Sequence, residues 1–383
     1  MLPAQISPPL KAYIPPPPTA EDLDFADLAV IDLSKASTLE GQAELVQQTR
    51  KALSEVGFFY VVNHGYSPSQ TARIFDIANL AFDQVSDEEK KEYARKDQAV
   101  YQGYKLRKEW VIDAGVRDEI EHYSIHRNVV AQEHPAVLRP FIPELAAFTR
   151  QNHYQVLHPI LRLLAKGLEL PEDTFTKMHG FDAPGYSSMR FQKYHPRADA
   201  DEVLAKNVWL KGHTDIGTVT ILYSQPIGGL QILSPDNKWR WIKHVDNALV
   251  VNVGNGIEFL SGGYYRATKH RVVQPPADQQ NIPRLGVFYF SMANDDVKLS
   301  PLVQSPLLQR EGIKKYFTDG EAPTMEEWRR ERTSRYGTSQ LKPSVTEEGV
   351  EEEIIHGTSS YLAACGSVAG QTCGFSLAHF FTG

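Results

Sequence analysis

The stretch Trp209-Leu210-Lys211-Gly212-His213-Thr214-Asp215 and its downstream counterpart Ala267-Thr268-Lys269-His270-Arg271-Val272-Val273 decide how this sequence is interpreted. Both stretches lie between about residues 184 and 296, where short β-patterned runs are separated by Gly, Pro, Asn and Asp. Short strands at this spacing are typical of an antiparallel barrel or a jelly roll. We therefore predict a mainly β fold with a jelly-roll core and flanking helices.

Three side chains in these two stretches form a candidate metal site. Residues two apart on an extended backbone share a face, so His213 and Asp215 can both reach one ion, and His270 can complete the set from a later strand. Two imidazoles and one carboxylate on one side of a metal leave the opposite positions open, which is the arrangement used for iron(II) and O₂ chemistry. We predict that these three residues bind the metal and form the catalytic centre. Zinc accepts the same donors, so a zinc hydrolase stays open at this point.

A later strand-like segment, from Arg284 to Phe290, alternates in the same way. Alternation places Arg284, Gly286, Phe288 and Phe290 on one face. The guanidinium of Arg284 can donate two parallel hydrogen bonds to a carboxylate, which suits the distal end of a small dicarboxylic acid better than a lysine would. If this face borders the metal site, Arg284 is the anchor for such a ligand; otherwise it forms a surface salt bridge.

A second alternating segment precedes the metal stretch. It places Arg190, Gln192 and Tyr194 on one side, and the Tyr194 hydroxyl can donate to the same carboxylate as Arg284. Each of these side chains is equally well explained as a buried polar group that is hydrogen-bonded within the fold.

The chain resembles the isopenicillin N synthase-like branch of the 2-oxoglutarate/iron(II)-dependent dioxygenases over about residues 28 to 296. The resemblance rests on Val30-Ile31-Asp32-Leu33, Gly57-Phe58-Phe59-Tyr60-Val61-Val62-Asn63-His64-Gly65, His213-Thr214-Asp215, Gly228-Gly229-Leu230-Gln231, Trp241, Val251-Asn252-Val253-Gly254 and His270-Arg271-Val272. It implies a double-stranded β-helix with iron near one open end. It also implies that 2-oxoglutarate and O₂ are consumed, that succinate and CO₂ are released and that a small organic molecule is oxidised, by default hydroxylated, with ascorbate as a supporting reductant.

The resemblance also assigns roles to individual residues and reveals two departures. It implies that His213, Asp215 and His270 bind iron(II). It further implies that 2-oxoglutarate is bound by Arg284, Tyr194 and Gln192, the last two at the family's Asn-x-Tyr pair. The family commonly has Ser where this chain has Gly286, so one hydroxyl contact to 2-oxoglutarate is missing; many relatives have Asp where this chain has Asn255, which we expect to affect a turn and not the metal.

Four residues are candidates for the substrate side of the site. Phe288, Phe290 and Tyr104, the last within the segment Tyr101–Tyr104, can line an apolar pocket or pack in the core, and Lys211 shares the predicted face of His213. The other strand-end histidines, His64, His195 and His244, are expected to be structural.

The chain divides into five predicted regions: an extended Pro-rich arm (1–27), an N-terminal α/β region packing on the core (28–183), the jelly-roll core (184–296), a helical region (297–357) and a tail of unknown role (358–383). Helical spacing predicts helices over 42–56, 67–94, 145–168 with an interruption at Pro159, and 325–335.

Composition limits the partners. The formal net charge is −7 with interspersed charges, which argues against nucleic acid or an anionic membrane as partner, and the chain shows neither a secretory signal nor a membrane-spanning stretch. Two cysteines in the whole sequence fit a reducing, cytoplasmic setting. No obligate protein partner is indicated, and the expected partner is a small-molecule substrate, with secondary metabolism as a compatible setting. An iron oxidase that does not use 2-oxoglutarate and a non-catalytic jelly-roll binding protein stay open as alternatives.

Overall fold

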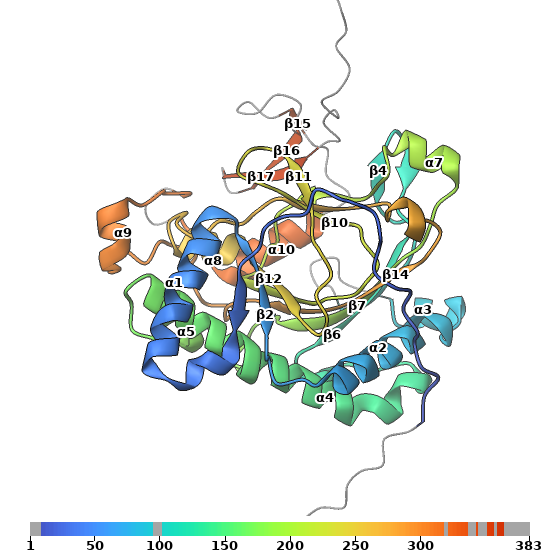
Figure 1. Ribbon diagram of the computed structural model, residues 1–383, viewed down its shortest axis with the longest axis horizontal. Coiled ribbons are helices and arrows are strands. Elements are labelled where there is room, and N and C mark those ends of the chain that lie inside the picture. The colour runs from blue at the N-terminus through green and yellow to red at the C-terminus, as the bar shows by residue number, and fades with distance from the viewer. Residues whose placement is uncertain are drawn as a thin grey trace, which may run out of the picture.

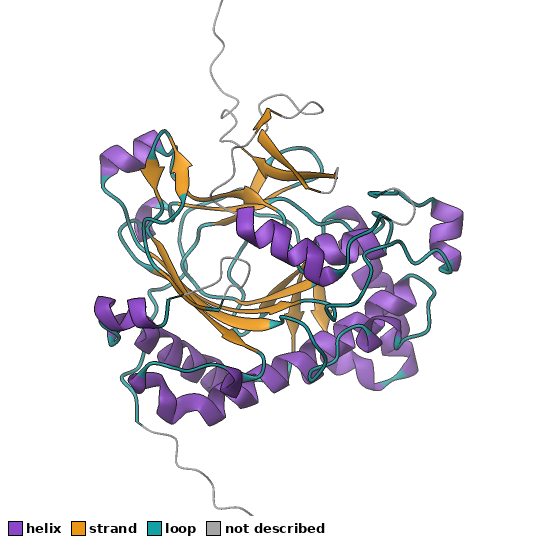
Figure 2. Cartoon of the chain, turned by 180° about the vertical axis from the view of Figure 1, so that it is seen from behind, coloured by secondary structure: helices purple, strands orange, loops and turns teal. Residues whose placement is uncertain are grey.

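Two β-sheets face each other, and helices cover the outer face of the larger sheet (Figures 1 and 2). The computed structural model describes residues 9–94, 102–317 and 321–335 and the strand segments 342–343, 351–355 and 358–363. The sheets are mainly antiparallel and enclose a cavity, so the prediction of a jelly roll with flanking helices is confirmed.

The larger sheet contains strands from both the predicted N-terminal region and the predicted core. Its order is β1 (Val30–Asp32), β2 (Phe58–Val62), β12 (Leu249–Val253), β9 (Val219–Tyr223), β14 (Arg284–Ser291), β7 (Ser188–Tyr194), β6 (Ile120–His126) and β3 (Gly103–Lys105). Only the pair β1 and β2 is parallel among the described pairs of this sheet. The N-terminal region therefore adds its own strands to the core sheet, and its helices pack on the same sheet.

The smaller sheet faces the cavity from the opposite side. Its order is β11 (Trp239–Trp241), β10 (Leu230–Leu233), β13 (His270–Val273), β8 (Val208–His213), β17 (Thr358–Ala363), β16 (Glu351–Ile355) and β15 (Lys342–Pro343). The region 297–357 was predicted to be helical, yet it contributes β15 and β16 to this sheet. The start of the predicted tail forms β17, with Leu362 opposite His213; residues 364–383 lie outside the described residues. A separate hairpin consists of β4 (Val111–Asp113) and β5 (Val116–Arg117).

The helices include the four predicted regions, with two differences, and further short helices that were not predicted. They are α1 (Leu39–Glu55), α2 (Pro68–Asp83), α3 (Asp87–Glu92), α4 (Ile142–Gln151), α5 (His158–Gly167), α6 (Thr174–Lys177), α7 (Asp199–Leu204), α8 (Asn255–Leu260), α9 (Pro306–Glu311) and α10 (Met325–Arg335). The single helix predicted over 67–94 is two helices: α2 ends at Asp83, and Ser86 caps the start of α3 by accepting a hydrogen bond from the Glu89 N–H. A π-helical segment over 152–157 separates α4 from α5, so the predicted interruption lies just before Pro159. Within the described residues, no helix is both long and apolar enough to cross a bilayer.

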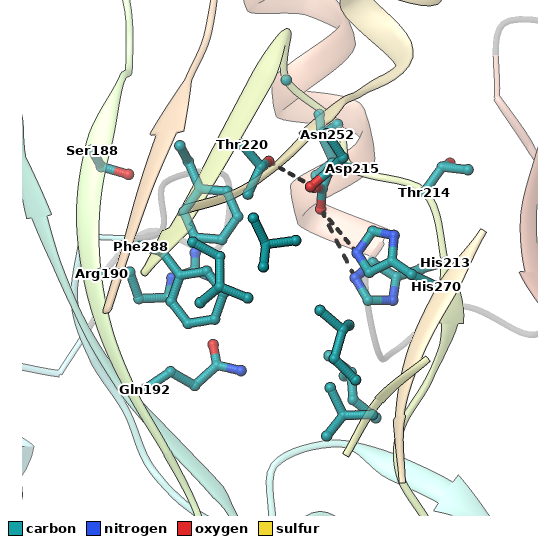
Figure 3. Close-up of a pocket in the computed structure, with 18 of the residues that line it drawn as sticks. Ser188, Arg190, Gln192, His213, Thr214, Asp215, Thr220, Asn252, His270 and Phe288 are labelled. Atoms are coloured by element: carbon teal, nitrogen blue, oxygen red, sulfur yellow. Dashed lines mark hydrogen bonds and ion pairs between the residues drawn. The ribbon is translucent and has the colours of Figure 1, made fainter. Parts of the chain in front are cut away.

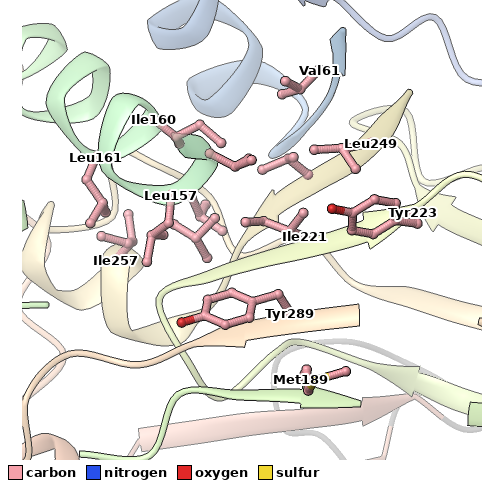
Figure 4. Close-up of a cluster of buried hydrophobic side chains, with 14 of the residues drawn as sticks. Val61, Leu157, Ile160, Leu161, Met189, Ile221, Tyr223, Leu249, Ile257 and Tyr289 are labelled. Atoms are coloured by element: carbon pink, nitrogen blue, oxygen red, sulfur yellow. The ribbon is translucent and has the colours of Figure 1, made fainter. Parts of the chain in front are cut away.

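Alternation along the strands separates the hydrophobic core from the cavity. Ile221, Leu249 and Tyr289 point to the helices and are completely buried there (Figure 4). Their neighbours Thr220 and Phe288 point to the other face and line the cavity. Full burial of each large apolar side chain contributes about 1.5–3 kcal/mol, so the helix-covered face gives the sheet the rigidity with which it positions the polar side chains of the other face.

Candidate active site

The three predicted metal ligands meet at one end of the cavity (Figure 3). His213 ends β8 and is the register partner of His270, which begins β13. Asp215 follows β8 by two residues. Its Oδ1 lies 3.9 Å from Nε2 of His213 and 3.7 Å from Nε2 of His270. Each residue offers a ligand atom, all within 4.8 Å of one another, a spacing and donor set that fit one divalent metal ion.

Backbone carbonyls fix the orientation of both imidazoles. Nδ1 of His213 is 2.8 Å from the Lys211 carbonyl, and Nδ1 of His270 is 3.1 Å from the Thr268 carbonyl. Because a carbonyl oxygen only accepts, each Nδ1 carries the proton, and the lone pair is on Nε2, the nitrogen turned toward Asp215. Hydrogen bonds of this kind set the tautomer of metal-binding histidines.

Two polar side chains form hydrogen bonds with Oδ2 of Asp215, the carboxylate oxygen on the side away from the imidazoles. Its Oδ2 accepts hydrogen bonds from the Thr220 hydroxyl at 2.6 Å and from the Asn252 amide at 2.8 Å, which leaves Oδ1 directed at the imidazoles (Figure 3). Neither Thr220 nor Asn252 was predicted to have a role. The available signal was a single polar residue on the cavity face of an otherwise apolar strand, at Thr220 in β9 and at Asn252 in β12.

The protonation states of His213 and Asp215 suit metal binding. Burial, assisted by the neighbouring His270, lowers the pKa of His213 to about 4, so this imidazole is neutral at pH 7. Burial alone would raise the pKa of Asp215, but the two histidines and the hydrogen bonds from Thr220 and Asn252 outweigh it and lower the pKa below its ordinary value. The site therefore presents a neutral imidazole and a carboxylate without further proton loss.

Lys211 does not share the face of His213, contrary to the prediction. The register between β8 and β13 shifts here, because the four residues of β8 from Leu210 to His213 oppose the three residues of β13 from His270 to Val272. This bulge reverses the alternation, so Leu210 lines the cavity together with His213, and Lys211 is not among the described residues that line it.

Arg284 lies in the wall of the same cavity and is 4% exposed. Within the described part of the chain its Nε has no hydrogen-bond partner and no carboxylate forms an ion pair with it. Burial lowers the pKa of this guanidinium, and a buried cation of this kind is costly unless an anion pairs with it. The arrangement therefore fits a bound carboxylate and excludes the alternative of a surface salt bridge.

Gln192 and Tyr194 flank Arg284 on the neighbouring strand. Tyr194 is the register partner of Arg284, whose guanidinium carbon lies 5.6 Å from the tyrosine ring centroid. The Gln192 side-chain amide donates to the Tyr194 hydroxyl. Burial raises the pKa of Tyr194 to about 12, so the phenol keeps its proton at neutral pH and can donate to the same carboxylate as Arg284.

The remaining walls of the cavity are largely apolar, and its volume is about 120 Å³. Phe288 and Phe290 both line it, with their rings stacked 5.3 Å apart. The prediction that Tyr104 lines the cavity is wrong: this side chain is completely buried in the helix-covered core, stacks on Tyr123 and donates its hydroxyl to the Ala81 carbonyl at 2.7 Å. Tyr101 lies outside the described residues.

The other histidines singled out from the sequence make hydrogen bonds elsewhere: His64 with the Asn247 carbonyl, His195 with Glu121 and His244 with Ser224 and Asp246. None of them belongs to the metal-type cluster.

Asn255 supports the loop that carries Asp215 through its backbone, because its N–H donates to the Asp215 carbonyl at 2.8 Å. Gly254 is needed beside it, since a Cβ there would lie 2.6 Å from that carbonyl oxygen.

Known proteins with similar sequences are oxygenases. The chain is 27% identical to jasmonate-induced oxygenase 3 of Arabidopsis thaliana over 73% of this chain and 77% of the relative. It is 26% identical to homoarginine-6-hydroxylase 2-ODD-C23 of Glycine max, over 73% and 89%. A 2-oxoglutarate-dependent dioxygenase of Gibberella zeae, FG08081, is 34% identical over 43% of this chain and 48% of the relative.

Solved structures share the fold. A full-length Neurospora crassa protein in complex with alpha-KG and 5-formyluracil matches with a TM-score of 0.69 and 22% identity, covering 82% of this chain and 99% of that one. JOX2 in complex with 2OG, Fe and JA matches with a TM-score of 0.62 and 23% identity, covering 85% and 90%. These likenesses agree with the jelly roll described above.

Two family models match consecutive parts of the chain. The N-terminal model of non-haem dioxygenases in morphine synthesis matches residues 28–144, and the model of the 2OG-Fe(II) oxygenase superfamily matches residues 186–292, which contain all three metal-type side chains and Arg284. The chain therefore belongs to the 2-oxoglutarate/iron(II)-dependent oxygenase superfamily and is an oxidoreductase of the 2-oxoglutarate-dependent dioxygenase class.

Proposed function

We propose that this dioxygenase hydroxylates a small organic molecule, with iron(II) bound by His213, Asp215 and His270 and 2-oxoglutarate anchored by Arg284. The observation that carries the proposal is that three metal-type donors and a buried guanidinium without an ion-pair partner in the described chain line one cavity. When bound together, iron(II), 2-oxoglutarate and O₂ supply an oxidation in which the keto acid becomes succinate and CO₂ and one oxygen atom enters the substrate.

The side chains and carbonyls of the protein position the metal ligands and the cosubstrate. The Lys211 and Thr268 carbonyls orient the two imidazoles, and Thr220 and Asn252 orient Asp215. Arg284 fixes the distal carboxylate of the cosubstrate, assisted by Tyr194 and Gln192. The apolar walls around Phe288 keep water from the reacting groups.

The substrate is proposed to be a small molecule of secondary metabolism. The similar proteins support this, since their names include jasmonate-induced oxygenases, a homoarginine hydroxylase and a probable flavonol synthase. The proposal includes a cytoplasmic location, supported by the presence of only two cysteines, and activity without an obligate protein partner.

The test is succinate formation by the purified full-length protein with iron(II), ascorbate, 2-oxoglutarate and O₂. His213→Ala should abolish succinate release, and Arg284→Gln should raise the KM for 2-oxoglutarate at least about tenfold, as expected for a lost charge-assisted pair. His64→Gln is the matched control, because His64 is a buried histidine outside the cavity. Substrate oxidation that proceeds without 2-oxoglutarate would favour the iron oxidase alternative, and hydrolysis supported by zinc without O₂ uptake would favour the hydrolase.

A further inference from the structure

One wall of the catalytic cavity comes from outside the two main sheets. Among the described residues between 63 and 185, Trp110 alone lines this cavity, and it is 6% exposed. It precedes β4, and Asp118 follows β5, so the two residues flank the base of the separate hairpin that Figure 1 shows beside α7. Because Trp110 lies on a loop and not on a strand of the main sheets, other contacts must keep its indole in the cavity wall.

A fully buried ion pair supplies contacts of this kind. Lys105 and Asp118 are both 0% exposed, and Nζ of Lys105 donates to Oδ1 of Asp118. The same Nζ lies 4.2 Å from the centroid of the Trp110 ring, within the range of a cation–π interaction. It also donates to the Ile120 carbonyl at 2.8 Å, which ties the ammonium group to the start of β6.

Asp118 binds the backbone of the loop that carries Trp110. Its Oδ2 accepts a hydrogen bond from the Trp110 N–H at 2.7 Å, and its own N–H donates to the Trp110 carbonyl at 2.9 Å. The Lys108 N–H donates to the Asp118 carbonyl at 2.8 Å. The ion pair therefore contacts both the main chain and the indole of Trp110.

Stability alone is a weak explanation for this ion pair. Moving two charges out of water costs free energy that their attraction repays only in part, and replacing a buried ion pair by apolar side chains often leaves stability unchanged or raises it. The hydrogen bonds and the ring contact of this pair converge on one residue that lines the cavity. This arrangement indicates a role in placing that residue.

Trp110 lies at the end of the cavity where Gln192 and Tyr194 are. Its ring centroid is 6.0 Å from that of His122, which is the register partner of Gln192. It also belongs to the same apolar cluster as Tyr194, the register partner of Arg284. An indole in this position can cover the carbon chain of a ligand bound to Arg284 and keep water from that charge-assisted pair, which strengthens the pair.

We propose that Trp110 is a binding residue of the 2-oxoglutarate pocket and that the buried Lys105–Asp118 ion pair positions its indole there. This inference rests on the proposed function. It gives Lys105 and Asp118, neither of which lines the cavity, a role in cosubstrate affinity.

Calorimetric titration of 2-oxoglutarate into the full-length protein loaded with Mn(II) tests the proposal. Trp110→Ala should weaken binding about threefold to tenfold, the factor expected when an ion pair becomes hydrated. Lys105→Met combined with Asp118→Asn should weaken binding by a similar factor. This double variant leaves no charge buried without its partner, and the asparagine oxygen can still accept from the Trp110 N–H. Adding Trp110→Ala to it should cause no further loss, because the ion pair acts through the indole.

Lys90→Met combined with Glu121→Gln is the matched control. This ion pair is also buried, with 2.8 Å between Nζ of Lys90 and Oε2 of Glu121, and neither residue lines the cavity, so 2-oxoglutarate affinity should not change. Acrylamide quenching of fluorescence reports the position of the indole, with Trp110→Phe separating its signal from that of the other tryptophans. Trp110 should be shielded in the unmodified protein and accessible in the Lys105→Met/Asp118→Asn variant. In succinate formation, that variant should raise the KM for 2-oxoglutarate and leave kcat unchanged, whereas a general loss of structure would lower kcat.

Three results would overturn the proposal: unchanged 2-oxoglutarate affinity in Trp110→Ala, losses that multiply in the triple variant, or an equal loss in the control variant. If the Lys105→Met/Asp118→Asn variant does not fold, Asp118→Asn alone takes its place, because it removes one charge and keeps the shape of the side chain. Unchanged affinity in that variant would then overturn the proposal. Absence of 2-oxoglutarate binding in the unmodified, Mn(II)-loaded protein would instead count against the proposed function itself.

Discussion

The ring of Phe288 occupies the space in which a side chain at position 286 would lie. Both residues are on the cavity face of β14, and a Cβ built on Gly286 would be 2.6 Å from Cε2 of Phe288. The glycine that replaces the family's common serine is therefore matched to the phenylalanine two residues later. A serine side chain at position 286 and the Phe288 ring in the cavity wall would compete for the same space. The chain has the ring and therefore lacks the serine hydroxyl near the cosubstrate.

Gly286→Ser should consequently lower the free energy of unfolding by about 1–3 kcal/mol, the usual cost of overpacking, and should not increase the affinity for 2-oxoglutarate. Combining it with Phe288→Leu should restore stability and allow the new hydroxyl to approach the cosubstrate. Urea unfolding and 2-oxoglutarate titration of the single and double variants measure both effects. Tighter 2-oxoglutarate binding by Gly286→Ser alone, at unchanged stability, would show that the ring does not oppose a side chain at 286.

Thr220→Val should weaken iron binding about 10- to 100-fold, because it removes the hydrogen bond that aims Asp215 while keeping the shape of the side chain. The measurement is anaerobic titration with iron(II), or with Co(II) as a spectroscopic substitute. Thr49→Val is the control, since Thr49 is also buried but its hydroxyl has no hydrogen-bond partner in the described chain. Equal metal affinity in both variants would contradict a role for Thr220 in orienting Asp215.

The sequence was sufficient to predict the metal-type cluster, because His213 and Asp215 are two residues apart at the end of one strand-like stretch and His270 begins another. Lys211 was placed wrongly for a physical reason: a bulge adds one residue between Leu210 and His213, and a single sequence carries no mark of the extra residue. Tyr104 was placed wrongly because an aromatic residue in a strand has the same pattern whether it lines a cavity or packs in the core.

The C-terminal strands could not be predicted for a different reason. Thr358–Ala363 pairs with β8, more than a hundred residues earlier in the chain. Strand partners at such separation leave no local periodicity, and the small and polar residues of this region resemble a tail. By contrast, α10 has the bounds that its charged pattern predicted, because that signal is local.

Stability should fall as the pH is lowered from 7, because buried histidines resist protonation in the fold. Burial lowers the pKa of His153 to about 3 and that of His179 to about 4, against an ordinary value of 6.5. Below pH 6.5 the unfolded chain binds protons at these two sites and the folded chain does not, so each contributes a loss of about 1.4 kcal/mol per pH unit until its folded pKa is reached.

His153→Gln should therefore make the fall of stability between pH 6.5 and pH 4.5 less steep by about 1.4 kcal/mol per pH unit, the contribution of one titrating group. Urea unfolding at pH 7.0, 6.0, 5.0 and 4.5 gives the two slopes, and a constant difference between variant and unmodified protein across this range would exclude His153 as one of the titrating groups.

The N-terminal arm, which the sequence predicted only as an extended Pro-rich segment, is expected to affect cosubstrate affinity. Asp278 fixes it by accepting hydrogen bonds from the Thr19 hydroxyl at 2.7 Å and the Ala20 N–H at 2.8 Å. Figure 1 shows the arm passing β11 before it reaches β1, and Phe25 forms a bridge with Trp241 there. Arm residues line a second cavity of about 220 Å³ whose wall includes Arg284, so the arm limits access of water to this guanidinium.

Asp278→Ala should release the arm, admit water to Arg284 and weaken 2-oxoglutarate binding about threefold to tenfold, since a hydrated ion pair is about 1 kcal/mol weaker. Iron affinity should not change, because the metal-type cluster is not in contact with the arm cavity. Glu169→Ala is the matched control: it removes a surface carboxylate that pairs with Arg310 at 2.5 Å, away from the arm. Calorimetric titration of 2-oxoglutarate compares the two variants, and limited proteolysis verifies that only Asp278→Ala loosens residues 9–23. If the arm becomes protease-sensitive while 2-oxoglutarate affinity equals that of Glu169→Ala, the walls of the catalytic cavity alone are enough to shield Arg284.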